Sequence, residues 1–395
     1  MQEHPKTILF VHNSNDLYGS DIVLFNLIQA LDKTEFRPIV VLPEDARRIG
    51  RLSAKLETID IPYKFVPLGV LRRRSLTIRW IGPMCTELIY AIGALCILIH
   101  RERVDIVHTN TVTVPAAAFA AVLMNRPHIW HIHEIIPEKA GSRKMLHWVV
   151  AHLSSRIVAV SNAVRSHILL DQPRKVEKIE VIHNGIDLSP FMSQECGRGS
   201  VRDELNMSNQ ALVVGMIGRV SQWKGQSVFA EAAARIVAEY RELYFVAVGG
   251  VFDNQQEYMT VFQRQVESLN LKNFRICDYR QDIPEVLRSF DIFVLPSILP
   301  DPFPTVVIEA MASALPVIAS ECGGVSEMVV PGLTGILVPP GDVGALASAI
   351  QRLVLDDAGR VAMGEAARRR AKTEFQLARF VRQFERTYRS VLPHA

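Results

Sequence analysis

The sequence predicts an α/β fold made of two Rossmann-like domains that face each other across a cleft. Short apolar runs rich in β-branched residues alternate with longer helical patterns, as is typical of strands and crossover helices in a mainly parallel sheet. The alternation begins twice, and a polar stretch separates the two series. A chain of 395 residues is also too long for one ordinary core. Open α/β sheets bind ligands at the carboxyl ends of their strands, so the loops after the strands are the candidate sites.

The first series predicts an N-terminal, acceptor-binding domain over residues 1–187. An apolar stretch at residues 88–99 is too short for the ~20 residues that span a membrane, and we expect a buried helix there. The other expected elements are a helix at 20–31 and strands at 7–12, 37–43, 104–110, 126–133 and 155–161.

The second series predicts a C-terminal domain over residues 206–374, after a linker at 188–205. The tail has apolar residues at helical spacing, which predicts an amphipathic helix, and we expect residues 375–395 to pack on the N-terminal domain. The strands of the second series are expected within 211–219, 243–250, 273–278, 291–297, 315–320 and 334–340.

Composition excludes several classes of protein. The chain is 49% hydrophobic and 22% charged with a net charge of +3, so no overall basic field indicates a nucleic-acid partner. Five scattered cysteines without a CxxC pair speak against a disulfide framework or a zinc knuckle. The N-terminus lacks the features of a secretory signal, and we expect a cytoplasmic protein.

A basic segment precedes the apolar stretch of residues 88–99. It contains Arg72, Arg73, Arg74 and Arg79. Such a segment is able to rest on an anionic lipid surface, which would place the protein at the inner face of the membrane. A solvated basic loop is the alternative, and both interpretations stay open.

Two cations follow the first strand of the second series. Arg219 and Lys224 lie in "GRVSQWKGQ", beside Gly218 and Gly225 and before a helix. Cations at a strand end, next to glycines that allow close approach of the backbone, are suited to clamp a diphosphate. The loop matches neither a Walker sequence nor GxGxxG. A pair of merely solvated side chains is the alternative.

The stretch "PDPFPTVVIEAMA" follows another predicted strand. Pro302 and Pro304 stiffen the turn, and a helix is expected to begin at about Thr305, so its first amides would suit a phosphate. Glu309 stands within an otherwise apolar helix and needs a partner. Vicinal sugar hydroxyls would supply one; a neighbouring loop or an arginine would do so equally.

Together these motifs resemble the retaining nucleotide-sugar glycosyltransferases of family 4, which have the GT-B fold. In the second half the resemblance lies in "GRVSQWKG" and "PDPFPTVVIEAMASALPVIASECGGVSEMVVPGLTGILVPPGD". In the first half "YGSDIVLFNLIQAL" is similar to the family's Gly-rich first turn and "WHIHE" to its strand end with a histidine and an acid. "RIVAVSNAVRSHI" and "VIHNGIDLSPF" resemble the segments before the hinge, so the resemblance covers nearly the whole chain.

The resemblance implies a role for each matching residue. Arg219 and Lys224 would hold the donor diphosphate, Glu309 the ribose hydroxyls, and Asp301 the hydroxyls of the transferred sugar. His133 would contact the sugar near its anomeric centre, and these five are the expected catalytic residues. The expected donor-binding residues are Gly19, Gly218, Arg219, Lys224, Tyr279, Ile283, Asp301, Phe303, Pro304, Thr305, Val306 and Glu309.

Two positions depart from the family pattern. The first acid of the usual glutamate pair is Asp301, and Phe303 with Pro304 stands where a glycine is usual, so the donor sugar would sit differently or be a different sugar. In the first turn Tyr18 replaces the leading glycine, which would narrow that side of the site.

We expect neither a metal nor a cofactor. His131 and His133 share one face of their predicted strand and could bind zinc, but no third ligand with suitable spacing follows. No DxD triplet occurs in the chain. Arginine, lysine and helix amides would then neutralise the leaving diphosphate.

The expected reaction is transfer of a sugar from a nucleotide diphosphate sugar, with UDP or GDP as the nucleotide, to a hydroxyl of a glycan or lipid-linked acceptor. The resemblance implies retention of the anomeric configuration. Two other classes stay open. A sugar-nucleotide epimerase on the same fold would need acid and base groups, for which Asp301, His133 and Glu134 are candidates. A non-catalytic nucleotide-sugar binding protein is the second.

Overall fold

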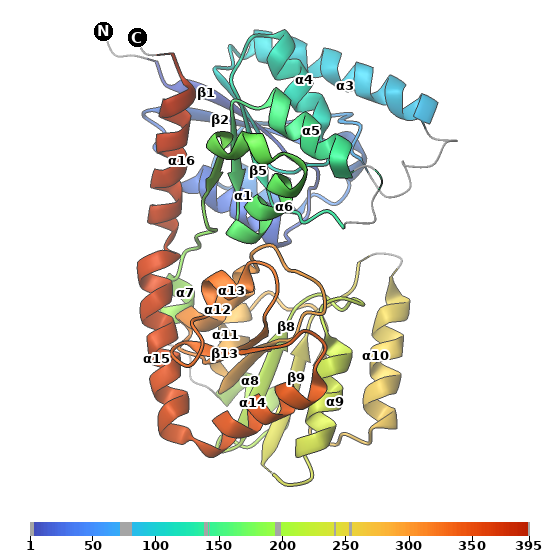
Figure 1. Cartoon of the computed structure of the whole chain (residues 1–395), viewed down its shortest axis with the longest axis vertical. Helices are drawn as coiled ribbons and strands as arrows, with labels where there is room; N and C mark the ends of the chain where they lie inside the picture. Colours follow the sequence, from blue (N-terminus) through green and yellow to red (C-terminus); the bar gives the residue numbers. More distant parts are fainter. Residues whose placement is uncertain are drawn as a thin grey trace. The chain divides into compact units, whose positions relative to one another are not determined.

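Two units of similar size make up the chain. The computed structural model describes residues 4–71, 81–137, 141, 143–193, 199–240, 242–252 and 255–393. One unit comprises Met1–Gly185 with Leu377–Ala395, and the other comprises Ile186–Gln376. Each has a parallel sheet covered by helices, which confirms the predicted pair of Rossmann-like domains (Figure 1). The basic segment of residues 72–79 lies outside the described residues.

In the described part of the first unit, strands form a parallel sheet in the order β3-β2-β1-β4-β5-β6-β7. Side chains of β1 alternate between two cores: Ile8 and Phe10 face one, Leu9 and Val11 the other. Burial of both faces explains why these strands are almost uniformly apolar in sequence. The strands are β1 (Lys6–Val11), β2 (Phe36–Pro43), β3 (Tyr63–Val66), β4 (Ile106–Thr109), β5 (His128–Ile132), β6 (Arg156–Ala159) and β7 (Ile179–Val181).

Helices cover both faces of this sheet. Residues of α1, α2 and α16 form the core on one face, and residues of α3 and α4 form the core on the other. The helices of the first unit are α1 (Gly19–Ala30), η1 (Glu44–Ala46), α2 (Arg51–Glu57), α3 (Ile81–Arg101), α4 (Pro115–Leu123), α5 (Arg143–Leu153), α6 (Asn162–Asp171), η4 (Pro173–Lys178) and α16 (Leu377–Val391).

The apolar helix α3 is buried on one side only, so the expectation of a buried helix at residues 88–99 is wrong. Ala91, Leu95 and Ile99 are at most 1% exposed, whereas Ile89 and Ile97 are 69% and 55% exposed. Residues four apart share a face of a helix, and only one face of α3 packs on the sheet and α4. Within the described residues no helix is long and apolar enough to cross a membrane.

The C-terminal helix α16 packs on the first unit. Phe380, Phe384 and Tyr388 are buried against the sheet, and the hydroxyl of Tyr388 lies 2.9 Å from Nδ1 of His108 in β4. An ion pair joins Arg389 at the end of the helix to Glu35, just before β2. These contacts bind the last residues of the chain to its first strands.

In the second unit, the described strands form a parallel sheet in the order β10-β9-β8-β11-β12-β13. Val214 and Met216 of β8 pack with helices α9, α10 and α14 in one core. The strands are β8 (Leu212–Ile217), β9 (Leu243–Val248), β10 (Phe274–Cys277), β11 (Ile292–Leu295), β12 (Val317–Ser320) and β13 (Gly335–Val338). The helices are α7 (Ser189–Met192), α8 (Gly199–Glu204), α9 (Gln226–Ile236), α10 (Gln256–Ser268), α11 (Ile283–Arg288), α12 (Thr305–Ala312), α13 (Val325–Met328), α14 (Val343–Leu355) and α15 (Asp357–Glu374).

Residues 188–205, expected as a linker, belong to the second unit. The reason is the burial of Arg202, a residue of α8 that is 1% exposed. Its guanidinium donates to the carbonyls of Ser289, Asn209 and Ala211 and to the carboxylate of Asp291 at 2.8–3.0 Å. A polar sequence therefore packs here because each buried donor has an acceptor.

Candidate functional site

The loop between β8 and α9 presents two cations at the carboxyl edge of the second sheet. Its backbone is held in place, since the Gln226 side chain donates to the carbonyl of Arg219 (2.9 Å) and Ile298 N donates to the carbonyl of Trp223 (2.7 Å). Gly225 has φ +83°, and a Cβ there would lie 1.9 Å from the Pro296 carbonyl oxygen. Only glycine fits this turn, so the loop is tied to the segment that follows β11.

The structure brings Lys224 and Asp301 together. The Lys224 ammonium forms an ion pair with the Asp301 carboxylate, and both side chains are largely buried. The same ammonium lies 4.5 Å from the ring centre of Trp223. Arg219 stacks on Phe252, with its guanidinium carbon 3.5 Å from the ring centre. Aromatic faces thus support both cations of this loop.

A pair of glycines holds the backbone of Asp301. Gly324 N donates to the Asp301 carbonyl (2.8 Å), and Asp301 pairs with Gly323 as an isolated parallel bridge. Gly323 has φ +64°, and a Cβ there would lie 2.2 Å from the Asp301 carbonyl oxygen. The loop after β12 therefore sets the position of Asp301 beside Lys224.

Replacing Gly323 with alanine should lower the free energy of unfolding by roughly 2 kcal/mol or more, because the new Cβ combines backbone strain with a clash against Asp301. Gly332→Ala is the matched control. Gly332 also has a positive φ, +76°, but a Cβ there would meet no atom within 4 Å. Its cost should be limited to about 1 kcal/mol of backbone strain. Urea unfolding of the two variants measures the difference, and equal losses would contradict this account of the glycine pair.

Glu309 lies on α12, one turn after the helix begins. Pro304 is the N-cap residue of α12, and its side chain makes no hydrogen bond with the first backbone amides of the helix. These amides form the positive end of the helix dipole. Burial raises the pKa of Glu309 to about 7, although a hydrogen bond from the Thr305 side chain acts in the opposite direction. Among the ion pairs of the described residues none involves Glu309, so an arginine partner is not found there.

The other expected donor residues of the second unit lie in different surroundings. Phe303 is 4% exposed and its ring packs on Phe375, with ring centres 5.7 Å apart, so its side chain belongs to the core. Tyr279 is 47% exposed, and a Cβ on Gly250 would lie 3.4 Å from its Cβ. Ile283 begins α11, and Val306 is partly buried in the first turn of α12.

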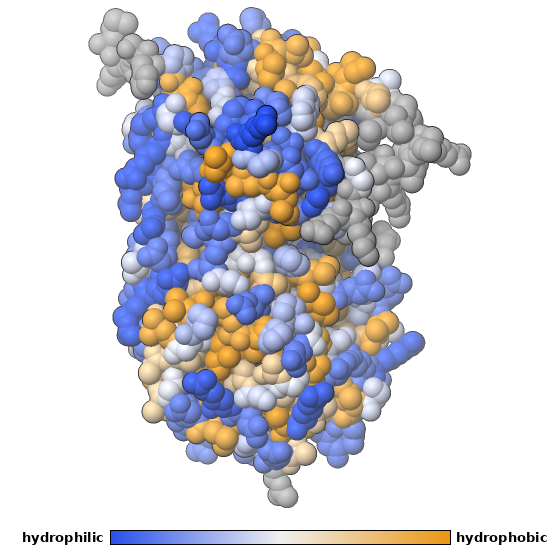
Figure 2. Space-filling model, in the orientation of Figure 1, coloured by the Kyte–Doolittle hydropathy of each residue, from blue (hydrophilic) through white to orange (hydrophobic). Residues whose placement is uncertain are grey.

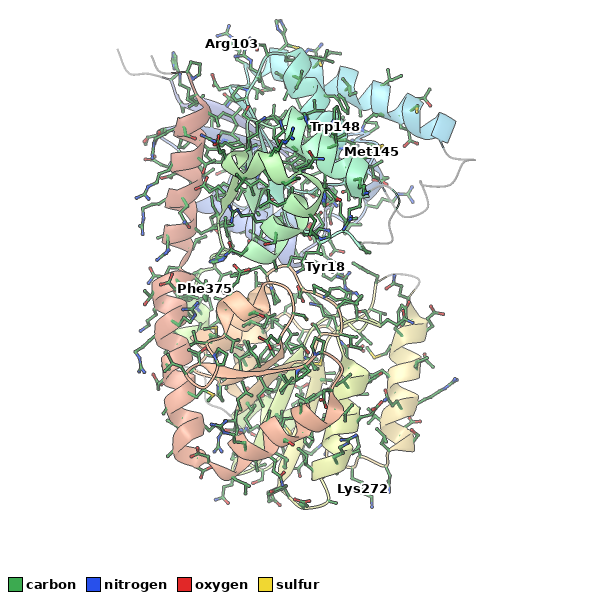
Figure 3. The ribbon with its side chains drawn as sticks, viewed as in Figure 1. Tyr18, Arg103, Met145, Trp148, Lys272 and Phe375 are labelled. Atoms are coloured by element: carbon green, nitrogen blue, oxygen red, sulfur yellow. The ribbon has the colours of Figure 1, made fainter. Side chains whose placement is uncertain are left out.

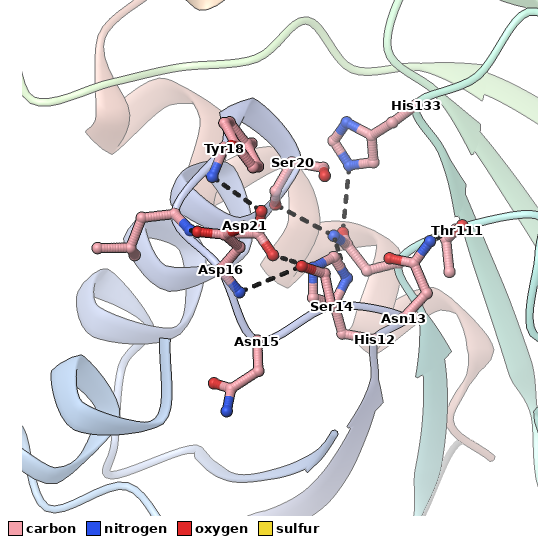
Figure 4. Close-up of polar contacts among 12 residues, drawn as sticks. His12, Asn13, Ser14, Asn15, Asp16, Tyr18, Ser20, Asp21, Thr111 and His133 are labelled. Atoms are coloured by element: carbon pink, nitrogen blue, oxygen red, sulfur yellow. Dashed lines mark hydrogen bonds and ion pairs between the residues drawn. The ribbon is translucent and has the colours of Figure 1, made fainter. Parts of the chain in front are cut away.

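Gly19 and His133 belong to the first unit. Figure 4 shows a polar network that includes His133 and Tyr18, the residue before Gly19. Gly19 is the first residue of α1, and the amide of the preceding Tyr18 donates to the Asp21 carboxylate (2.9 Å). The other oxygen of Asp21 lies 2.8 Å from Nε2 of His12. Burial alone would raise the pKa of Asp21, but its bonds with His12, Ser14 and Tyr18 outweigh burial and lower it. An ionised Asp21 thus holds the turn at Gly19.

Asn110 connects this turn to His133. Its amide nitrogen lies 3.3 Å from Nδ1 of His12 and donates to the carbonyl of Ser20 (3.3 Å), and its amide oxygen lies 3.2 Å from Nε2 of His133. Burial, with a smaller effect of His12, lowers the pKa of His133 to about 3. His133 is therefore neutral at pH 7 and acts as a hydrogen-bonding group rather than as a cation.

His12, Asp21 and Asn110 belong to this network, although the sequence analysis did not predict them as candidates. A signal was present, because His12 and Asn110 each directly follow a strand, β1 and β4, at the carboxyl edge of the sheet. Nothing in their spacing indicated that Asn110 would meet His12. That contact depends on the parallel pairing of β1 with β4, which places Val11 opposite Thr109.

Buried neutral histidines should make stability depend on pH. Burial lowers the pKa of His128 from its ordinary 6.5 to about 3. Between these values the unfolded chain binds more protons than the folded one, so the free energy of unfolding rises with pH. His128→Gln, which keeps an amide nitrogen near Thr109, should remove about 2 kcal/mol of the loss seen between pH 7 and pH 5. Urea unfolding at both pH values measures it, and an unchanged pH dependence would contradict the assignment.

The described residues include no group of three or more His, Cys, Asp and Glu side chains placed to hold a metal ion. In the same part of the chain, Cys85, Cys96, Cys277 and Cys322 are free thiols. Cys322 lies near the site, with Sγ 3.6 Å from the carbonyl oxygens of Ser297 and Leu299, and burial raises its pKa.

Comparison with known proteins identifies the family. The models of "Glycosyltransferase Family 4" and "Glycosyl transferases group 1" match residues 18–190 and 198–370. The alpha-maltose-1-phosphate synthase of Mycolicibacterium smegmatis is 30% identical over 316 residues, which cover 74% of this chain and 80% of that protein. An Escherichia coli UDP-Gal:alpha-D-GlcNAc-diphosphoundecaprenol alpha-1,3-galactosyltransferase is 28% identical over 303 residues, covering 74% of this chain and 76% of its own.

Solved structures agree with this family. The crystal structure of Anabaena Alr3699/HepE in complex with UDP and glucose has a TM-score of 0.82 and 25% sequence identity, and the match covers 97% of this chain and 99% of that chain. The two units are therefore those of the GT-B fold. The chain belongs to glycosyltransferase family 4, and it is a glycosyltransferase.

Proposed function

We propose that the protein transfers a sugar from a nucleotide diphosphate sugar to a hydroxyl group of a glycan or lipid-linked glycan, with retention of the anomeric configuration. The observation that supports this most is the grouping at the carboxyl edge of the second sheet. There, the loop of Arg219 and Lys224 is bonded to the segment after β11, and Lys224 contacts Asp301. This edge is where open α/β sheets bind nucleotides.

Charge development explains why these groups suit the reaction. As the bond to the anomeric carbon breaks, the diphosphate gains negative charge, which fixed cations stabilise without reorganisation. Arg219, Lys224 and the start of α12 would supply that positive charge, and transfer would need no metal. The Lys224 side chain is flexible enough to move from Asp301 to a phosphate oxygen, which would leave the Asp301 carboxylate to accept hydroxyls of the transferred sugar.

Retention is proposed to proceed on one face of the sugar. A donor phosphate oxygen would take the proton of the acceptor hydroxyl, so no carboxylate would act as the nucleophile. His133, kept neutral by burial, would hydrogen-bond the sugar from the first unit rather than provide charge. Glu309 would accept two hydrogen bonds from the ribose hydroxyls, in addition to the bond that it accepts from the Thr305 side chain.

The relatives suggest the donor and acceptor to test first. HepE was solved with UDP and glucose, and the Escherichia coli relative is named for transfer from UDP-Gal to a diphosphoundecaprenol-linked sugar. We propose a UDP-sugar ahead of a GDP-sugar as donor, and a lipid-linked glycan as acceptor. We further propose that the protein works in the cytoplasm.

A thermal-shift panel of UDP, GDP, ADP and their sugars tests the donor, because a ligand that binds the folded state raises stability by mass action. The nucleotide that binds then selects the labelled donor for a transfer assay. NMR of the product reports whether the anomeric configuration is retained. Release of an altered nucleotide sugar without acceptor would instead show an epimerase. Binding without turnover on any lipid-linked or free glycan offered would argue against the proposed transfer.

A further inference from the structure

Three helices of the first unit expose large apolar side chains on their outer sides. They form what we call the α3–α5 surface, which consists of Ile89, Tyr90 and Ile97 of α3, Val122 and Leu123 of α4, and Met145 and Trp148 of α5, each 52–69% exposed. Figure 2 shows hydrophobic atoms gathered over α3 and α4, and Figure 3 shows Met145 and Trp148 on α5. Single exposed apolar residues are ordinary, but a group of this size on neighbouring helices indicates a binding surface.

The packing of the helices places these side chains near one another. α4 packs against α3 on one side and α5 on the other. Cys96 Sγ in α3 lies 4.0 Å from the carbonyl oxygen of Ala120 in α4. Ile97 is the residue after Cys96, and Leu123 lies one turn after Ala120. On α5 the ring of Trp148 stacks on His152, with ring centres 4.5 Å apart. The exposed residues of α3 are spaced so that Tyr90 and Ile97 share the face opposite to Ala91 and Leu95.

Exposed cations accompany the apolar side chains. Arg101 is the last residue of α3 and Arg103 follows it, Arg126 follows α4, and Lys144 lies in the first turn of α5. Among the described residues of these helices Glu87, near the start of α3, is an exposed acid, and Glu102, between the two arginines, forms an ion pair with Arg37. A surface that combines apolar side chains, two amphipathic rings and an excess of cations has the composition of segments that lie in the headgroup region of anionic bilayers.

We propose that the α3–α5 surface docks the protein on a membrane of anionic lipid. Trp148 and Tyr90 would sit at the headgroup level, Ile97 and Leu123 would enter the acyl boundary, and the cations would contact lipid phosphates. A second copy of the chain fits this surface less well, because a two-fold contact sets the same patch against itself and would bring its cations together. The proposal rests on the surface of the first unit alone and does not depend on the transfer reaction.

Vesicle flotation tests the proposal without donor or acceptor, so its outcome is independent of catalysis. The full chain should float with vesicles of phosphatidylglycerol and phosphatidylcholine, and less with phosphatidylcholine alone. Ile97→Glu with Trp148→Glu should lower the bound-to-free ratio at least tenfold. Leu355→Glu with Val361→Glu is the matched control, since these residues are 69% and 64% exposed on α14 and α15 of the second unit, and it should float like the parent.

A charge variant keeps the test decisive if the apolar variant folds poorly. Arg126→Gln with Lys144→Gln should lower binding to anionic vesicles roughly tenfold or more at low salt and leave the circular dichroism spectrum unchanged. Absence of flotation of the parent with anionic vesicles would overturn the proposal. It would equally be overturned if the parent were dimeric by light scattering, Ile97→Glu with Trp148→Glu made it monomeric, and neither bound vesicles.

Discussion

Replacing either Arg219 or Lys224 with alanine should lower turnover by roughly 10²-fold or more while the protein remains folded. Both cations lie in the loop after β8, and each would stabilise charge that appears on the leaving diphosphate only as the bond breaks. The loss should therefore be seen in kcat as well as in kcat/KM. Nucleotide release from the donor that the thermal-shift panel selects gives both constants.

Lys272→Ala is the matched control for these two substitutions. Lys272 is an exposed cation of the same unit just before β10, at the amino edge of the sheet, where Figure 3 labels it. Its removal should leave turnover unchanged. Lys224→Ala also leaves the buried Asp301 carboxylate without its cation, so a lower melting temperature is expected for that variant and not for Lys272→Ala. Full activity of both site variants would refute the diphosphate clamp.

Replacing Glu309 with glutamine should raise the free energy of unfolding of the ligand-free protein by about 2 kcal/mol at pH 8. Burial raises the pKa of Glu309 from its ordinary 4.5 to about 7, so the folded protein binds more protons than the unfolded chain between these values. Stability therefore falls as pH rises through that window. Glutamine carries no charge, so the gain should be absent near pH 4 and complete near pH 8. Urea unfolding at the two pH values measures it.

The same substitution should weaken nucleotide binding roughly tenfold or more, because hydrogen bonds from ribose hydroxyls to a carboxylate are stronger than those to an amide. Titration calorimetry with the selected nucleotide measures the loss. Glu365→Gln, at a glutamate on α15 whose side chain is 47% exposed, is the control and should change neither stability nor affinity appreciably. Unchanged stability together with unchanged affinity would mean that burial does not destabilise the ionised Glu309 in the free protein and that Glu309 does not contact the nucleotide.

An ionised Glu309 would then lower the stability of the free protein and strengthen nucleotide binding. An ionised carboxylate among the apolar residues of α12 costs free energy in the free protein, and two ribose hydroxyls would offset that cost on binding. His128 has the opposite sign, because its buried ring is favoured neutral and loses stability as pH falls. Burial favours the neutral form of both groups, and the signs differ because a neutral carboxyl carries its proton whereas a neutral imidazole has lost one.

Much of the fold and part of the site could be predicted from local patterns. The alternation of apolar runs with helical periods predicted parallel sheets, because strands buried on both faces need near-continuous apolar residues. Polar residues directly after strands predicted the loops of Arg219 and Asp301, since carboxyl ends of parallel strands share one edge. The pattern failed for α3, because an apolar run on a helix looks the same whether or not another element covers its outer face.

Local sequence patterns were enough to predict the class of fold, the family and the two loops that hold Arg219, Lys224, Asp301 and Glu309, because these depend on residues close together in the chain. Which of these residues meet depends on the tertiary structure. The pairing of Lys224 with Asp301, the burial of Arg202 and the contact of His12 with Asn110 depend on strand order and on turns that only glycine fits. Contacts between distant segments have no period in sequence, and buried charges are recognised only once their partners are in place.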